Sequence, residues 1–333
     1  MSGCSIEKER LLDDVPSIAI IVLSWNSKAL LKKCLSTLTE KTDYSNYHTI
    51  VVDNGSSNES VAWIKEEFPC VDTIALDRNF GFSIGNNKGI AYAIKNHNPR
   101  YVLLLNNDTE IIQENWLRKL VLVAESNKSI GIVGSKLIYP DGTVQYIGTK
   151  LDMKGLSWLK PQKHPNLPEI YEVDGVLGAC FLIKREVIEK IGGLDSGFTP
   201  YGHEESDFCV RAKRAGYKIC MVFSVVIIHL NKASMSRVNS QYLHTMARKN
   251  QIRFMLLNFP VTWLVKRLPY ESVIRCFITR NKASAGGIPI KLRNSKDMFF
   301  EVKSNFKALT INIANLSDII NKRQNRTMKL PLQ

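Results

Sequence analysis

The sequence predicts an α/β protein whose central sheet is mostly parallel and is covered by helices on both faces. In the N-terminal half, short runs of Val, Ile and Leu alternate four times with segments of helical periodicity. These runs contain few polar residues, as is typical of strands that are buried on both faces. Beyond residue 130 the pieces become shorter and their order changes, which indicates a mixed second half.

The first half contains four strand–helix units. We expect strands at residues 17–23, 49–52, 73–76 and 101–105. We expect helices over 30–38, 60–68 and 115–126, and a further helix that ends near residue 96. Before that helix, residues 78–89 combine three glycines with amide and basic side chains, which predicts a loop whose backbone N–H groups approach phosphates. The loop matches neither the dinucleotide-binding pattern nor the P-loop.

In the second half we expect strands over 131–139, 144–148 and 222–228, with a turn at 140–142. An apolar stretch at 174–183 leads into a helix over 185–191, which two glycines end. Within that stretch, Gly178 and Ala179 have small side chains that let a ligand or another backbone segment come close. The proline-rich residues 160–168 are expected to form a mobile or lid-like loop.

Length and composition indicate a globular protein. The chain has 333 residues, of which 44% are apolar and 23% charged. Its apolar runs are much shorter than the roughly 18 residues that a membrane-spanning helix needs. Residues 1–16 form a mostly polar extension without the layout of a signal peptide, so we expect a cytoplasmic protein. Seven scattered Cys without a Cys-x-x-Cys pair argue against a disulfide framework and a zinc site.

The net charge of +14 is concentrated in the C-terminal third. Residues 231–333 contain 19 Lys and Arg but only 4 Asp and Glu, whereas residues 1–230 are nearly neutral. This asymmetry predicts an anionic partner for the C-terminal region, either nucleic acid or acidic lipid head groups. Residues 252–265 are rich in large apolar side chains with Lys and Arg around them. They form either a helical hairpin packed on the preceding domain or an interfacial segment on the cytoplasmic leaflet of a membrane.

Polar side chains follow several predicted strands. Asn106, Asn107 and Asp108 come directly after the strand at 101–105, Asp53 follows the second strand, and His229 follows the last one. In an open α/β sheet, ligands bind at the carboxyl edge of the strands. A carboxylate beside two amides offers the hard oxygen ligands that Mg²⁺ or Mn²⁺ accepts while a diphosphate supplies the rest. The alternative is a solvated turn formed by Asn and Asp.

Three carboxylates, Glu204, Glu205 and Asp207, lie within four residues at the start of a predicted helix. Acidic residues in a first turn are commonly explained by the helix dipole alone. Like charges this close also raise one another's pKa, which leaves a carboxylate able to accept a proton near neutral pH. Both interpretations fit the sequence.

Six motifs in one order make the chain resemble family 2 glycosyltransferases with the Rossmann-like GT-A fold, especially the rhamnosyltransferase-like and galactofuranosyltransferase-like branch. The resemblance covers about residues 17–260. The motifs are Val51-Val52-Asp53-Asn54-Gly55-Ser56-Ser57, Asn79-x-Gly81-Phe82-x-x-Gly85-Asn86-Asn87-x-Gly89, Leu104-Leu105-Asn106-Asn107-Asp108, Gly178-Ala179-Cys180, Glu204-Glu205-x-Asp207-x-Cys209-x-Arg211-Ala212 and Gly216-Tyr217.

The resemblance implies an inverting transfer of a sugar, of hexosyltransferase type, from a nucleotide-diphosphate sugar to a hydroxyl of a glycan or lipid-linked glycan, in the synthesis of cell-surface polysaccharide. It also implies a divalent metal, Mg²⁺ or Mn²⁺, at the diphosphate. Carried over by position, the metal ligands are Asp108, Asn106 and His229. The residues at the donor are Asp53, Asn26, Asn79, Asn87 and Asn107. The general base is Glu205, with Glu204 or Asp207 as alternatives.

The chain departs from the family pattern at two places. Many relatives have Glu-Asp where this chain has Glu204-Glu205, which puts the base one methylene further from its backbone. The metal motif contains one carboxylate instead of two, so metal binding is expected to be weaker in the absence of donor.

These expectations divide the chain into an extension at 1–16, a catalytic domain at 17–230 and a basic, mainly helical C-terminal region at 231–333. Within the catalytic domain, 17–129 is the nucleotide-sugar half and 130–230 the acceptor half. A sugar-nucleotide nucleotidyltransferase is an alternative function, but the first strand is followed by Leu23-Ser24-Trp25-Asn26 and not by a glycine-rich loop with a basic residue. A nucleic-acid-binding protein is disfavoured because the positive residues are dispersed and form no known RNA- or DNA-binding module. We expect a peripheral protein at an anionic membrane surface.

Overall fold

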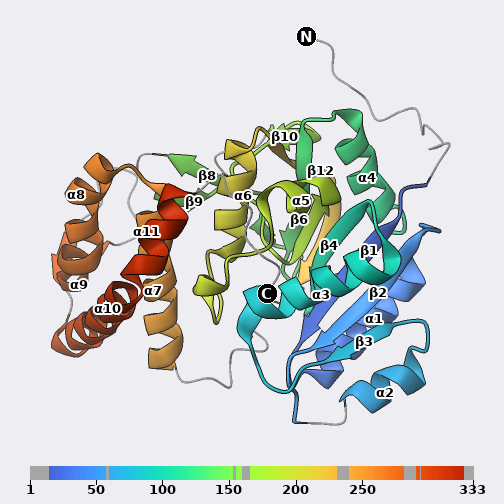
Figure 1. Cartoon of the computed structure of the whole chain (residues 1–333), viewed down its shortest axis with the longest axis horizontal. Coiled ribbons are helices and arrows are strands. Elements are labelled where there is room, and N and C mark those ends of the chain that lie inside the picture. The colour runs from blue at the N-terminus through green and yellow to red at the C-terminus, as the bar shows by residue number, and fades with distance from the viewer. Residues whose placement is uncertain are drawn as a thin grey trace.

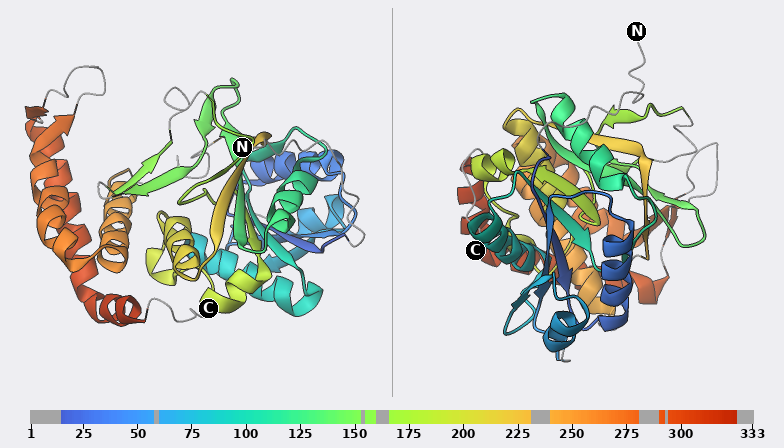
Figure 2. Two further views of the ribbon diagram at one scale, coloured as in Figure 1. Left: turned by 90° about the horizontal axis from the view of Figure 1, so that it is seen from above. Right: turned by 90° about the vertical axis from the view of Figure 1, so that its right-hand side faces the viewer.

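The central feature of the computed structural model is a large mixed sheet with helices around it (Figure 1). The structure describes residues 15–57, 60–152, 155–159, 166–230, 240–280, 290–292 and 294–325. Most of the lid-like loop predicted at 160–168 lies outside these residues. The C-terminal helices form a separate layer beside the sheet (Figure 2).

The sheet confirms the predicted mostly parallel first half and mixed second half. Its strand order is β10-β12-β6-β11-β4-β1-β2-β3, with β5 added to β12 and β7 added to β6. The parallel part consists of β3 (Asp72–Ala75), β2 (Tyr47–Asp53), β1 (Ile18–Ser24) and β4 (Tyr101–Asn106). Next to it, β11 (Cys180–Lys184) runs antiparallel to both β4 and β6 (Ile130–Ile138).

The remaining strands extend the second half beyond what the sequence predicted. The long strand β12 (Lys218–His229) runs parallel to β6 and pairs with the short strands β10 (Ile170–Glu172) and β5 (Thr109–Ile111). The strand expected at 144–148 is shorter, as β7 (Val144–Tyr146). A separate hairpin of β8 (Thr149–Asp152) and β9 (Gly155–Trp158) was not predicted.

Helices cover both faces of the sheet. Figure 2 shows α3 (Gly81–His97) and α1 (Lys28–Lys41) on opposite sides of it. The other helices of this domain are α2 (Ser60–Glu67), α4 (Trp116–Ser126), α5 (Arg185–Ile191) and α6 (Glu204–Arg214). The core between these layers consists of the fully buried strand residues of β1, β2 and β4 together with the inward faces of the helices. This layered core fixes the position of every strand end.

The glycine-rich loop predicted at 78–89 is wrong in most of its length, because α3 already begins at Gly81. The glycines repeat every four residues and lie where the helix meets the sheet. A Cβ atom on Gly85 would lie 2.5 Å from Leu23 Cδ1, and one on Gly89 2.6 Å from Ile21 Cγ2. These two glycines therefore allow close helix–sheet packing and do not form a phosphate-binding loop.

The C-terminal region is mainly helical, as predicted. It contains α7 (Ser240–Asn258), α8 (Val261–Pro269), a π-helical turn (Tyr270–Ile274), α9 (Arg275–Phe277), α10 (Ser295–Ala314) and α11 (Leu316–Gln324). The strands β13 (Ile278–Arg280) and β14 (Ile290–Leu292) pair with each other. In Figure 2, α7 lies between the sheet with its covering helices and the outer helices, with α10 and α11 packed on it.

The apolar segment 252–265 is the packed hairpin and not the interfacial segment. Phe254, Leu257 and Trp263 belong to a second hydrophobic cluster that also contains Phe198 from the segment before α6. The basic residues before and within this segment are buried too, with Arg253 only 2% exposed. These side chains cannot enter a lipid head-group layer while the hairpin stays packed. Among the described residues no helix is long and apolar enough to cross a membrane.

Candidate active site

The carboxyl ends of three neighbouring strands meet at one edge of the sheet. In the parallel register, Ser24 at the end of β1 pairs with Asp53 of β2, and the preceding Leu23 pairs with Asn106 of β4. The polar residues that the sequence placed after separate strands are therefore neighbours in space. This edge is where ligands bind in open α/β sheets.

Asp108 and His229 form a close pair at this edge, although 120 positions separate them in sequence. His229 is the last residue of β12 and pairs with Thr109 of β5, directly after Asp108. The His229 Nε2 atom lies 3.3 Å from Asp108 Oδ1 and 3.3 Å from Asn106 Nδ2. The backbone N–H of Leu230 also donates to the Asp108 carbonyl at 3.0 Å. The antiparallel β12–β5 pairing thus brings all three predicted metal ligands together.

Gln145, which the sequence analysis missed, fixes the orientation of His229. Its Nε2 donates to the His229 carbonyl at 3.0 Å, so its Oε1 faces the ring Nδ1 at 2.7 Å. An amide oxygen accepts only, and the neutral ring therefore carries its proton on Nδ1. The lone pair of Nε2 then points toward the Asp108 carboxylate. A lone glutamine on a short strand gives no sequence signal for this role.

The Asp108–His229 pair suits a divalent cation. An imidazole lone pair and a carboxylate oxygen at 3.3 Å repel each other unless a proton or a cation lies near both. An outer partner that holds the ring tautomer, as Gln145 does, is typical of metal-binding histidines. No group of three or more His, Cys, Asp or Glu in the described part of the chain could hold a metal by itself. The residues present therefore fit a metal that takes its other ligands from a bound diphosphate.

Glu205 lies close to the same strand end. Its Oε1 accepts a hydrogen bond from the backbone N–H of Gly178 at 3.1 Å, and the next carbonyl, of Ala179, accepts from Asn106 N at 3.3 Å. A Cβ atom on Gly178 would lie 3.0 Å from Glu205 Oε1 and 2.8 Å from Phe82 Cζ. The small residue predicted to allow a close approach does so here for the Glu205 carboxylate. Two hydrogen bonds thus connect Glu205 to the first residue of the metal motif.

Burial separates the two adjacent glutamates into different roles. It raises the pKa of Glu204 well above its usual value, and the neighbouring Glu205 raises it further. The Glu204 side chain is buried, and its Oε2 has no hydrogen-bond partner among the described residues. Burial also raises the pKa of Glu205, but hydrogen bonds from the backbone N–H groups of Glu205 and Gly178 oppose this rise. The pKa of both glutamates is raised, but that of Glu205 less so, which favours Glu205 as the member of the pair that accepts a proton.

The structure gives Asp207, the other alternative base, a structural role. Its carboxylate is fully buried and accepts from Arg211 Nε at 3.0 Å and from Asn258 Nδ2 at 3.0 Å. The Arg211 guanidinium in turn donates to the carbonyls of Ile191 and Gly193. A fully buried carboxylate that is held in an ion pair is not accessible to an acceptor hydroxyl. Asp207 holds α6 to the C-terminal helix α7.

Asp53 borders a hollow of about 490 Å³ at the outer part of the same edge. The hollow is lined by Asp53, Ser56, Val61, Ala62, Lys65, Ala75 and Leu76. Asp53 Oδ1 accepts from Ser56 N at 2.7 Å, while Oδ2 is buried without a partner in the described part of the chain. A buried acceptor without a donor is costly, so a ligand hydroxyl or N–H is the natural partner of this oxygen. The apolar walls suit the flat faces of a nucleobase.

Three of the four asparagines predicted at the donor hold loops together. Asn26 Oδ1 accepts from Ser57 N at 2.9 Å, and Asn107 Nδ2 donates to Ser24 Oγ at 3.2 Å. Asn79 Oδ1 accepts from Gly81 N at 2.8 Å, at the start of α3.

The structure contradicts the predicted donor contact of the fourth asparagine, Asn87. Its side chain is fully buried on α3, and it both donates to the Leu194 carbonyl at 2.9 Å and accepts from the Leu194 N–H at 2.9 Å. No part of this amide faces a ligand, so we no longer expect Asn87 to contact a donor.

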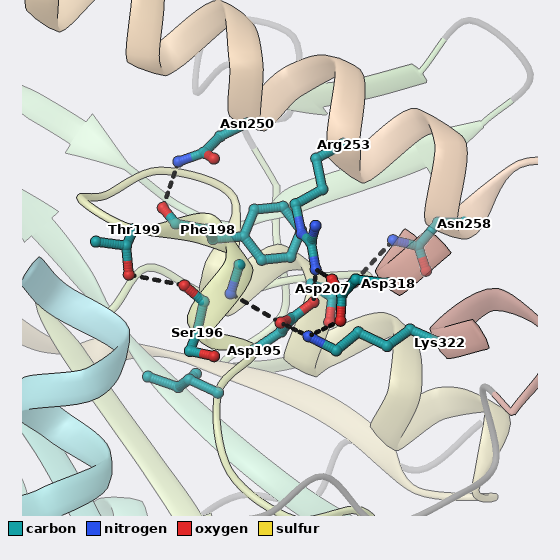
Figure 3. A network of polar contacts seen from close by, with 12 residues as sticks. Asp195, Ser196, Phe198, Thr199, Asp207, Asn250, Arg253, Asn258, Asp318 and Lys322 are labelled. Carbon is teal, nitrogen blue, oxygen red and sulfur yellow. Dashed lines mark hydrogen bonds and ion pairs between the residues drawn. The ribbon is translucent and has the colours of Figure 1, made fainter. Parts of the chain in front are cut away.

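The C-terminal helix α7 holds the loop at 195–203 that leads into Glu204 and Glu205 (Figure 3). Lys249 Nζ donates to the Gly197 and Thr199 carbonyls at 2.8 and 2.7 Å, and Asn250 Nδ2 donates to the Tyr201 carbonyl at 2.7 Å. The loop carbonyls thus receive donors from two successive residues of α7. The C-terminal region is therefore part of the support of the candidate base.

A buried ion-pair network anchors the start of the same loop. Arg253 donates to Asp195 Oδ2 at 2.9 Å, and Lys322 of α11 donates to Asp195 Oδ1 at 2.7 Å (Figure 3). Burial alone would raise the pKa of Asp195, but the Arg253 and Lys322 charges hold it well below its usual range. Charges that the sequence analysis assigned to an anionic partner are thus partly neutralised inside the protein.

With this geometry in place, the comparisons with known proteins identify the class. The sequence model "Glycosyl transferase family 2" matches residues 19–192, more than half of the chain. The model "N-terminal domain of galactosyltransferase" matches residues 164–238. The chain belongs to glycosyltransferase family 2, as its motifs predicted.

Among individual relatives, the low-salt glycan biosynthesis hexosyltransferase Agl10 of Haloferax volcanii is 30% identical over 275 residues, which are 81% of this chain and 83% of Agl10. The O-antigen biosynthesis protein RfbC of Myxococcus xanthus is 28% identical over 230 residues, 66% of this chain. The matched part is only 18% of RfbC and 23% of the uncharacterized protein y4gI of Sinorhizobium fredii. This chain thus corresponds to a small part of those longer proteins.

Solved structures agree on the fold. GalNAc-T7 with UDP, GalNAc and Mn²⁺ superposes with a TM-score of 0.60 at 16% identity, over 92% of this chain and 58% of that one. The mannosyltransferase PcManGT from Pyrobaculum calidifontis, in complex with GDP-Man and Mn²⁺, gives 0.52 at 14% identity, over 92% and 76%. Both are glycosyltransferases, and the likeness supports the predicted GT-A fold.

Proposed function

We propose that this protein is an inverting glycosyltransferase that moves a sugar from a nucleotide-diphosphate donor to an acceptor hydroxyl, with Glu205 as the general base. The observation that carries this proposal is the short connection from Glu205 through Gly178 and Ala179 to Asn106. It supports a proton-accepting carboxylate near the strand end that carries the Asp108–His229 pair. The base and the diphosphate site must be near each other, because the acceptor oxygen that the base deprotonates attacks the sugar carbon bonded to the diphosphate.

Glu205 accepts the acceptor proton as the new C–O bond forms. A free hydroxyl has too high a pKa to attack by itself, so a carboxylate within about 3 Å is needed to take its proton. Its neighbour Glu204, kept neutral by burial, adds no second negative charge beside the incoming oxygen. Direct displacement with inversion requires one base and no protein nucleophile, which agrees with the single accessible carboxylate of this pair.

Asp108, His229 and Asn106 would hold a divalent metal, Mg²⁺ or Mn²⁺. Such a cation offsets the negative charge that develops on the departing nucleoside diphosphate. Gln145 keeps the His229 lone pair directed at this position, and Asn107 holds the loop by its hydrogen bond to Ser24. The Mn²⁺ complexes of the two structural neighbours support this assignment.

The nucleoside would occupy the hollow beside Asp53. The unpartnered Asp53 Oδ2 accepts from the base or the ribose, while Val61 and Leu76 give apolar contact to the ring. The names of Agl10 and RfbC support a hexose donor and a glycan or lipid-linked glycan acceptor in cell-surface polysaccharide synthesis. The rhamnosyltransferase-like or galactofuranosyltransferase-like specificity stays a prediction.

A panel of nucleotide-diphosphate sugars tests the proposal. The purified chain is incubated with each donor and Mn²⁺ or Mg²⁺, and release of the nucleoside diphosphate is measured with and without added glycan acceptors. We expect slow hydrolysis of one donor class, with loss of this activity in chelator and its return with metal. Release of pyrophosphate from a nucleoside triphosphate and a sugar phosphate, with no donor hydrolysed, would instead establish a nucleotidyltransferase.

A further inference from the structure

The outer helix α10 presents large apolar side chains to solvent. Phe299, Phe306 and Ile313 are 69%, 73% and 67% exposed, and Val302 is 40% exposed. Spacings of seven residues place the first three on one face of the helix. Large apolar side chains that are exposed along one helix face are unusual on a protein surface and indicate a contact site.

The opposite face of α10, which packs on α7, is small and polar. Ser304, Asn305, Ala308 and Asn312 are buried there, and Asn312 Nδ2 donates to the Lys249 carbonyl at 3.0 Å. A helix that only covers a core turns its apolar face inward. Phe300 does lie against His244 of α7, but hydrophobic burial against α7 does not explain Phe299, Phe306 and Ile313.

A column of positive charge borders this apolar row. Lys296, Lys303 and Lys307 are all exposed, and their spacings of seven and four residues align them on the helix. Lys303 follows Phe299 by four residues and precedes Phe306 by three, so the column and the row are adjacent. None of the three lysines forms an ion pair with a described residue. Asp297, two residues before Phe299, lies on the other side of the helix.

We propose that α10 docks this protein on an anionic lipid surface. Phe299, Phe306 and Ile313 enter the head-group boundary, and the lysine column meets the lipid phosphates. The charge pattern favours lipid over a second copy of the chain. Two copies joined through this face would bring lysine columns near each other, and no exposed acidic residue among those that the structure describes on α10 borders the row. The helix lies in the interface and does not cross it, in line with the lack of a spanning helix among the described residues.

This surface is a different one from residues 252–265, whose aromatic side chains are packed inside the protein. It does not depend on the identity of the sugar donor. It lies in the outermost helix layer, with α7 between it and the sheet (Figure 2). A membrane-held acceptor is compatible with this arrangement but is not required by it.

Co-sedimentation of the full chain with vesicles tests the proposal. Vesicles of phosphatidylcholine alone are compared with vesicles that also contain phosphatidylglycerol, at low and high salt. The charge variant is Lys303→Glu with Lys307→Glu, and the apolar variant is Phe299→Ser with Phe306→Ser. Matched controls are Lys128→Glu, an exposed lysine of the catalytic domain, and Val265→Ser, a 70% exposed apolar residue of α8.

We expect binding to acidic vesicles that weakens as salt rises. Each lysine near an acidic surface contributes about 1 kcal/mol, so the double charge variant should bind at least about 25-fold more weakly. The apolar variant should lose binding to a similar or greater extent, and both controls should bind like the unchanged chain.

Three results with vesicles overturn the proposal. They are equal binding to neutral vesicles, no binding to acidic vesicles at low salt, and vesicle binding that the α10 variants leave unchanged. Because all four substituted side chains are exposed, the variants should keep the thermal midpoint and donor hydrolysis of the unchanged chain. Analytical ultracentrifugation without lipid completes the test. A dimer that Phe306→Ser dissociates would show that a second copy covers this face, which also overturns the proposal.

Discussion

Replacing Arg253 with Met tests whether the C-terminal region supports the candidate base. Arg253 is 2% exposed and pairs with Asp195, whose side chain has no exposure. Met keeps the length and apolar stem of the side chain but removes its charge and its hydrogen bonds. Asp195 then keeps only Lys322 and the Gly197 N–H, at the start of the loop that leads to Glu205.

Breaking a buried ion pair by removing one partner costs about 3–5 kcal/mol, since the other charge stays buried and unpaired. Lys322 remains close to Asp195, so we expect the lower end, about 3 kcal/mol. The Lys322→Met change should cost less, about 1–2 kcal/mol, because Lys322 is 21% exposed and Arg253 stays in place. As a matched control, Lys303→Met on the exposed face of α10 should change stability by less than about 0.5 kcal/mol.

Urea unfolding followed by tryptophan fluorescence gives these stabilities, and donor hydrolysis below the unfolding transition gives kcat and KM. We expect Arg253→Met to lower kcat more than it changes the KM of the donor, since the loop positions Glu205 and the Asp53 hollow lies elsewhere. A midpoint equal to that of Lys303→Met would refute the energetic role of the network. Loss of stability with unchanged kcat would refute its role in positioning the base.

Four further predictions follow from the same site. Glu205→Gln should lower kcat by roughly 10²–10⁴ with little change in donor binding. Glu204→Gln, which replaces an already neutral acid, should keep a kcat within about tenfold of the unchanged enzyme. If steady-state assays give the reverse order, the base is Glu204 and not Glu205. Asp108→Ala should abolish transfer while circular dichroism shows a folded protein, and more than a few per cent of residual activity would reject its assignment. Gln145→Leu should raise the Mn²⁺ concentration needed for half-maximal activity by about 10–100-fold, because the His229 ring loses the amide oxygen that orients it. An unchanged Mn²⁺ titration would count against this role of Gln145. The pKa of Asp195 is lower in the folded protein, so the stability that this carboxylate contributes is present above pH about 4 and is lost as the pH falls further. The difference between the urea midpoints at pH about 3 and about 6 should therefore be smaller in Arg253→Met than in the unchanged protein.

The sequence by itself determined the elements whose signal is local. Short apolar runs identified β1, β2 and β4, because the part of a strand that is buried on both faces contains few polar side chains. The same runs placed Asp53 and Asp108 at strand ends, since the first polar residues follow directly. Family motifs then identified the glycosyltransferase class, because their order and spacing are preserved along the chain.

Other features depend on contacts between distant residues, and only the tertiary structure decided them. The glycines of α3 fit either a phosphate loop or a tightly packed helix, and the choice depends on Leu23 and Ile21 in another strand. The separation of Glu204 from Glu205 is a matter of burial and of the Gly178 N–H, neither of which is written in the local sequence.

The largest correction concerns the basic C-terminal third. Composition counts charges but does not show where they point. Arg253 and Lys249 turn inward to a carboxylate and to loop carbonyls more than 45 positions earlier in the chain, and the Phe residues of 252–265 pack in a core. The charges of α10 turn outward instead. Which side of a helix meets the protein is fixed by the packing of α7 against its neighbours, and that physical choice exists only in the folded chain.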